Sequence, residues 1–61
     1  MYRIAIVDDE RDAAEALRGL IERYAAETGV GLETVCYENA VAFLTNYRAN
    51  FDIVFMVQRL L

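Results

Sequence analysis

The chain has 61 residues and a mass of 7.0 kDa, which allows one small domain at most. A core of this size is marginal, and small chains usually add disulfides, a structural metal or a partner. The single cysteine excludes an intramolecular disulfide and the absence of histidine excludes a Cys/His zinc site, so a partner is the expected solution.

The charge balance is acidic, with ten Asp and Glu against six Arg, no Lys and a net charge of −4. This argues against a nucleic-acid partner, because a phosphate backbone is bound by a basic patch. The longest apolar runs, 40–44 and 53–57, have five residues each, whereas a membrane span needs about 20. Acidic residues begin at Asp8 and interrupt the first apolar run, so no signal peptide is expected. We therefore expect a cytoplasmic chain without a membrane partner, in which Cys36 is a small buried side chain.

The first half of the chain predicts a strand followed by a long helix. Residues 2–7 are an apolar run rich in Ile and Val, which is typical of a strand buried on both faces in a parallel sheet. From 11 to 28 the apolar spacing changes to three and four, which predicts a helix that ends at Gly29 in the left-handed conformation. The apolar face of this helix is expected to contain Ala13, Leu17, Leu20, Ile21, Tyr24 and Ala25.

The second half predicts a strand, a helix and a third strand. Residues 32–37 alternate between apolar and polar, and Glu33 suggests a partly exposed edge strand. Asn39 is the expected N-cap of a helix that ends at Asn50 in the left-handed conformation. The helical positions are Ala40, Phe43, Leu44 and Tyr47. The continuous β-favouring run 53–57 predicts a fully buried strand.

The expected architecture is α/β in the order β-α-β-α-β. Its connections are too long for hairpins, so the three strands should be parallel. Right-handed crossovers then favour the strand order 2-1-3 with one helix on each face. Ligand sites in such sheets form beyond the carboxyl ends of the strands, at the point where the strand order reverses. Asp8, Asp9 and Val57 should face one crevice there.

The acidic pair Asp8 and Asp9 has two interpretations. One carboxylate could cap the following helix by accepting backbone N–H groups. Alternatively, the pair could hold a hard cation such as Mg²⁺, which prefers oxygen ligands and relieves the repulsion between the carboxylates. Residue spacing leaves both open.

Two segments resemble bacterial two-component response-regulator receiver domains. Residues 4–10 (IAIVDDE) resemble the opening of a receiver, and 51–56 (FDIVFM) resemble the run into its phosphoacceptor strand, at matching separation. The long first helix, the Gly-bounded turn and the YENA segment at 37–40 resemble receivers attached to LytTR-type domains. The resemblance implies a flavodoxin-like fold, of which the chain spans the first half of a receiver of ~120 residues, a truncated domain.

The resemblance also implies chemistry, namely phosphoryl transfer from a histidine kinase to an aspartate, with Mg²⁺ at Asp8 and Asp9. Val57 stands at the phosphoacceptor position, and an isopropyl group is no nucleophile. The chain also contains no Lys or Ser to contact a phosphoryl group. Mg²⁺ binding is weakened as well, because a central oxygen ligand is missing. The chain is thus expected to be a receiver-derived signalling module without catalytic residues, firm cofactor or phosphotransfer of its own, and not an enzyme.

In a complete receiver the strand over 53–57 would be covered by a further strand. An uncovered apolar edge favours joining another chain. The alternatives are an unstable fragment that aggregates, a homodimer in which these edges or exposed helix flanks meet across a two-fold axis, or a module that caps another receiver by strand addition. A nucleotide-binding half-domain is less favoured, because no glycine-rich loop follows the first strand. The expected interface residues are Ile53, Val54, Phe55, Met56 and Val57.

Overall fold

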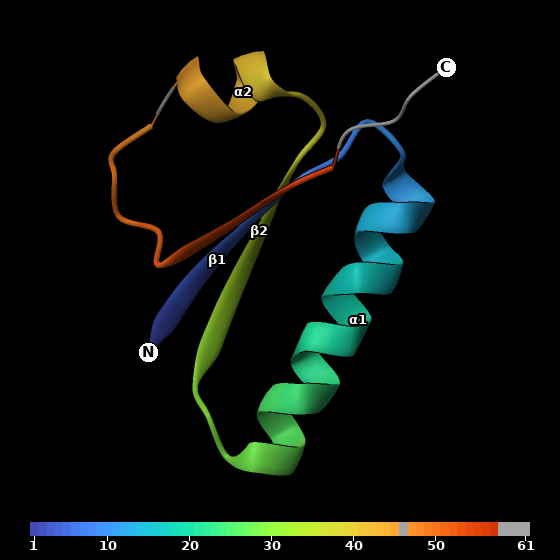
Figure 1. Ribbon diagram of the computed structural model, residues 1–61, viewed down its shortest axis with the longest axis vertical. Coiled ribbons are helices and arrows are strands. Elements are labelled where there is room, and N and C mark those ends of the chain that lie inside the picture. The colour runs from blue at the N-terminus through green and yellow to red at the C-terminus, as the bar shows by residue number, and fades with distance from the viewer. Residues whose placement is uncertain (46, 58–61) are drawn as a thin grey trace.

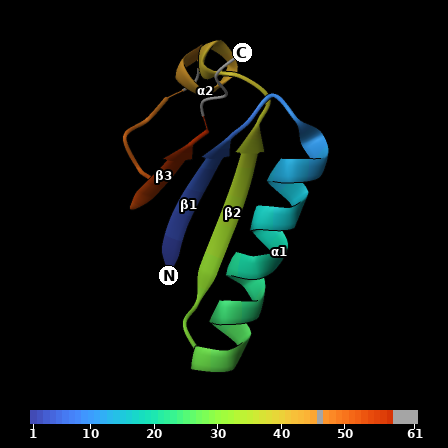
Figure 2. The same ribbon diagram turned by 45° about the vertical axis from the view of Figure 1, so that its right-hand side comes forward.

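The computed structural model describes residues 1–45 and 47–57. Its elements are β1 (Tyr2–Val7), α1 (Arg11–Thr28), β2 (Leu32–Tyr37), α2 (Ala40–Thr45) and β3 (Ile53–Met56). The strands form one parallel sheet in the order β2-β1-β3 (Figures 1 and 2). The predicted α/β architecture and strand order are therefore confirmed.

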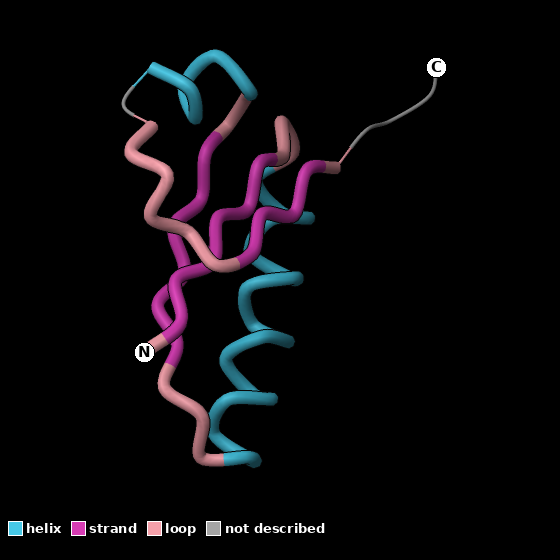
Figure 3. The backbone as a smooth tube through the Cα atoms, turned by 60° about the vertical axis from the view of Figure 1, so that its left-hand side comes forward, coloured by secondary structure: helices cyan, strands magenta, loops and turns pink. Residues whose placement is uncertain are grey.

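The central strand β1 pairs along its full length with β2 but only along part of its length with β3. The register runs from Tyr2↔Leu32 to Val7↔Tyr37 on one side, and from Ile4↔Ile53 to Val7↔Met56 on the other. The loop from 47 to 52 leads from α2 back along the sheet to the start of β3 (Figure 3). Because β3 pairs with β1 alone among the described strands, it is an edge strand.

The two helices cover opposite faces of the sheet. Alternate residues of β1 point to opposite faces, and they contact different helices. Ile4 and Ile6 pack against Ala14 of α1, while Ala5 and Val7 pack against Phe43 of α2. The first cluster is extended by Leu17, Ile21 and Leu32, and the second by Tyr37 and Phe51. One helix on each face was predicted and is confirmed.

Both helices begin or end at predicted residues. Gly29 has φ 75° and its N–H donates to the Ala25 carbonyl over 2.8 Å, which ends α1 in the left-handed conformation that a side chain would strain. Asn39 Oδ1 accepts the Ala42 N–H at 2.7 Å and so caps α2. The end of α2 was predicted wrongly, since it stops at Thr45 and the left-handed residue is Ala49, with φ 53°, instead of Asn50. Tyr47 therefore lies beyond the helix.

The burial of α1 differs from the prediction on one flank. Leu20 and Tyr24 were assigned to the apolar face of the helix, yet each is 61% exposed. The helix packs over β1 and β2, so its flank toward β3 is left open to solvent (Figure 2). No helix within the described residues is long and apolar enough to cross a membrane.

Two further burial predictions are corrected. The strand over 53–57 was expected to be fully buried, but its exposed fractions lie between 38% for Phe55 and 51% for Met56. It pairs with one strand only, and among the described elements neither helix covers it. Cys36 is exposed as well, because β2 is the opposite edge of the sheet and its end faces a hollow beside α1. The exposure of Glu33 on β2 agrees with the edge position predicted from it.

Candidate functional site

Asp8 is a buried acid at the carboxyl end of β1. Its side chain is 5% exposed, and its backbone N–H donates to the Tyr37 carbonyl of β2 at 3.0 Å. Its Oδ1 accepts the Glu10 N–H at 2.9 Å, which forms the side-chain turn that aspartate commonly makes two residues ahead. Asp8 therefore shapes the connection between β1 and α1.

This contact agrees with the interpretation that the acidic pair accepts a backbone N–H at the start of the helix. The N-cap of α1 is Glu10, whose side chain makes no capping hydrogen bond, while its carbonyl accepts the Ala14 N–H at 3.0 Å. Asp8 lies before the cap and holds the turn, and Asp9 is exposed between the two. The Glu10 N–H that Asp8 accepts belongs to the residue that caps α1.

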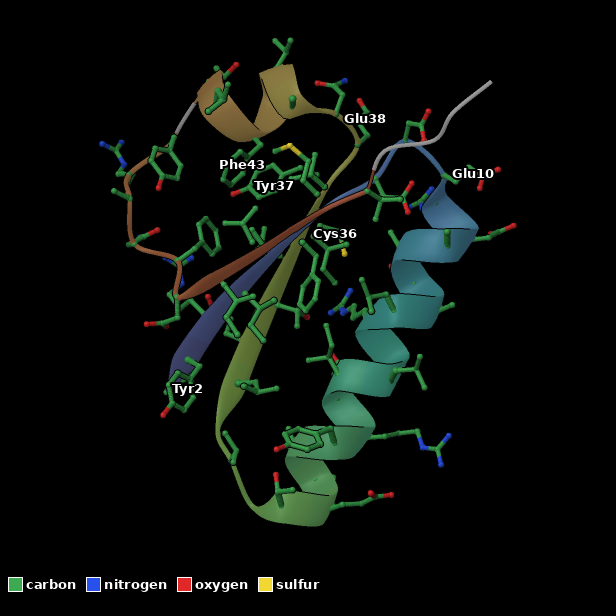
Figure 4. The ribbon with its side chains drawn as sticks, viewed as in Figure 1. Tyr2, Glu10, Cys36, Tyr37, Glu38 and Phe43 are labelled. Carbon is green, nitrogen blue, oxygen red and sulfur yellow. The ribbon has the colours of Figure 1, made fainter. Side chains whose placement is uncertain are left out.

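Asp8 and Asp9 border an acidic hollow of about 390 Å³ between the end of β2 and the start of α1. Its described lining is Asp8, Asp9, Arg11, Ala14, Glu15, Cys36, Tyr37 and Glu38. Figure 4 shows Cys36 pointing toward α1 and Glu38 at the end of β2. Four carboxyl residues against one arginine make this hollow electronegative, so it disfavours anions and attracts cations.

The described residues do not by themselves make a metal cluster. Among them there is no group of three or more His, Cys, Asp or Glu side chains that could hold a metal ion. Mg²⁺ needs near-octahedral oxygen coordination, of which Asp8 and Asp9 would supply only part. Their assignment as Mg²⁺ ligands stays a prediction, and no step of a mechanism is derived through it.

Val57 lies at the same end of the sheet as the acidic pair. Its backbone N–H donates to the Val7 carbonyl at 3.0 Å, which places it beside the strand that leads directly into Asp8. Its side chain is 39% exposed. The structure thus brings Asp8, Asp9 and Val57 to one end of the sheet, while the acidic hollow opens toward β2 and has no described lining from β3.

Sequence reasoning missed the contribution of β2 to this site. Cys36, Tyr37 and Glu38 line the hollow, although the prediction placed the site between β1 and β3. The parallel register aligns Val7 with Tyr37, so β1 and β2 end at the same level of the sheet. The equal lengths of the two predicted strands, 2–7 and 32–37, could have indicated that the residues after both strands lie close together.

The predicted interface residues are exposed on both faces of the sheet. In the register with β1, Ile53 and Phe55 lie on the α1 face, and Val54 and Met56 lie on the α2 face. Each of the four is at least 38% exposed. Exposure is what an interface would need, but a partner for these residues stays a prediction.

The chain was compared with protein families, curated proteins and solved structures, and none of the three comparisons finds a match. Its function is therefore inferred from its own geometry and from the resemblance of its motifs.

Proposed function

We propose that the chain is a receiver-type signalling module of the phosphorelay family that does not itself accept a phosphoryl group. The order of the sheet and the acidic pair after β1 support this, since both belong to the arrangement that the motifs resemble. The proposal places the module in the cytoplasm with a histidine kinase as its partner. Such a module would signal through binding and not through its own chemistry.

The hydrogen bond from Val57 to the Val7 carbonyl carries the proposal. It puts an isopropyl group at the end of β3, beside the strand that leads into Asp8, where the resemblance assigns the phosphoacceptor. An aspartate there would add a third carboxylate to this end of the sheet. Valine instead provides neither a nucleophile nor an oxygen ligand.

The test restores the carboxylate with Val57→Asp and uses Val57→Asn as the matched neutral control. Both changes fall at a half-exposed position, so the fold should tolerate them. Only the Asp variant is expected to bind Mg²⁺ saturably in calorimetry. Its thermal midpoint should also rise with Mg²⁺, because a ligand at 100 times its Kd stabilises by about 2.7 kcal/mol.

The wild-type midpoint should stay nearly unchanged in millimolar Mg²⁺. The proposal fails if Val57→Asp gains no Mg²⁺ binding, or if the wild-type chain incorporates phosphate from acetyl phosphate.

A second candidate function is an interaction module that receives a strand at the edge of β3, for example from another receiver. The observation that favours it is an exposed apolar strand that carries no charge or proline to protect its edge. Val57 donates its N–H inward to β1, and alternate residues of a strand direct these groups to opposite edges. The N–H of Val54 therefore points away from β1.

Val54→Pro removes this outward N–H and leaves the bonding to β1, while Val54→Ala keeps it. Binding of a receiver partner should be lost in the first variant and kept in the second. Equal binding by both would exclude strand addition.

A further inference from the structure

An apolar groove of about 500 Å³ lies between α1 and β3. Its described lining is Tyr2, Ile4, Leu20, Ile21, Tyr24, Val30, Leu32, Ile53 and Phe55, and none of these residues is charged. The apolar groove exists because α1 packs over β1 and β2 and leaves this face of β3 uncovered.

The surface around the apolar groove combines a ridge and a floor. Leu20 and Tyr24, four residues apart on α1, form the ridge and are each 61% exposed. Ile53 and Phe55 form the floor, at 46% and 38% exposed, and Tyr2 lies at the rim at 52%. The exposed side chains of α1 and the recessed side chains of β3 therefore lie next to each other on one apolar surface.

The chemistry of the groove distinguishes among possible occupants. Small-ligand sites combine apolar walls with a few convergent polar groups, and here the described walls are almost wholly apolar. An anionic membrane surface recruits clusters of Lys and Arg, whereas this chain has a net charge of −4. A second copy fits better, because an isologous interface uses the same patch twice and needs each copy to supply both ridge and floor.

The area of the patch is close to what a stable dimer needs. At 150–250 Å² per aromatic side chain, Tyr2, Tyr24 and Phe55 leave about 300 Å² uncovered. Leu20 and Ile53 add further apolar area. A standard interface buries about 800 Å² per partner, of which somewhat more than half is apolar. Pairing of the four-residue edge of β3 alone would leave Leu20 and Tyr24 in water.

We propose that two copies of the chain associate across a two-fold axis through the apolar groove, with Leu20 and Tyr24 of each copy covering Ile53 and Phe55 of the other. The proposal does not rest on the receiver assignment, because Val57 does not line the apolar groove. The Mg²⁺ test at Val57 and the oligomeric state can therefore fail separately.

The test measures mass by sedimentation velocity at tens of micromolar for the wild type, Leu20→Glu and Ala26→Glu. Position 20 is exposed in the single chain, so Leu20→Glu should keep the fold, as checked by circular dichroism, while charging the ridge. Ala26 is exposed on the same helix and does not line the groove, so Ala26→Glu is the matched control. We expect dimers for the wild type and the control, and monomers for Leu20→Glu.

A monomeric wild type, or a folded Leu20→Glu variant that remains dimeric, would overturn the proposal. Loss of the dimer in Val54→Pro together with its retention in Leu20→Glu would also overturn it, in favour of edge pairing through β3.

Discussion

Asp8 is the one charged residue that is buried among the described residues. A hydrogen bond to a neighbouring residue of the same turn makes this burial possible. A carboxylate taken out of water loses several kcal/mol of solvation unless hydrogen bonds replace it. The Glu10 N–H provides one such bond at 2.9 Å and at the same time fixes the turn into α1. Asp8 therefore has a structural role whether or not a cation binds beside it.

Replacing Asp8 tests this role. Asp8→Ala should lower the free energy of unfolding by about 1 kcal/mol, because the Glu10 N–H loses its acceptor. Asp8→Asn keeps an oxygen at the same position and should lose less. Urea unfolding of both variants gives the difference. Equal stability of the two would show that the hydrogen bond contributes nothing.

The exposure of Cys36 can be measured directly. Its thiol borders the acidic hollow and is exposed in the folded chain. We expect a neutral maleimide to label the native protein at a rate close to that of the urea-unfolded protein. Labelling that proceeds only as fast as global unfolding would place Cys36 in the core, where its residue type alone had suggested it.

At the scale of elements, the features that could be predicted are those with local causes. The bounds of α1 follow from the apolar period and from Gly29, and Asn39 marks the start of α2 through its own side chain. The exposure of Leu20 and Phe55 could not be predicted, because it depends on where α1 lies across the sheet and on what covers β3. The spacing of apolar residues and the composition identify the apolar face of a helix or strand, but not the element that packs against it.

The two glycines of the α1 region should respond oppositely to alanine. Gly19 lies inside the helix with open space where a Cβ would be, so Gly19→Ala should raise the free energy of unfolding by about 1 kcal/mol. Gly29 has a positive φ, so Gly29→Ala should lower it by a similar amount. Chemical denaturation of both variants is the measurement. Stabilisation by Gly29→Ala would mean that α1 does not end in the left-handed turn.

At the scale of the whole molecule, the two faces of the sheet are closed to different degrees. On the α2 face, Phe43 packs edge-on against Tyr37 at 5.3 Å between ring centroids and lies 6.0 Å from Phe51. On the α1 face the apolar groove stays open. With a shortest extent of 14 Å, the molecule has little depth in which to bury that surface by itself. Any residues that cover the apolar groove therefore come from outside the described part of the chain.

If a second copy closes the groove, thermal stability must depend on protein concentration. For a dimer that unfolds to two separate chains, each tenfold increase in concentration adds about 1.4 kcal/mol of apparent stability. Because both chains of the dimer unfold together, this raises the thermal midpoint by roughly 5 °C per tenfold. Scanning calorimetry over a roughly hundredfold range should show this rise for the wild type and a flat midpoint for Leu20→Glu. A flat wild-type midpoint would mean that the apolar groove stays open in solution.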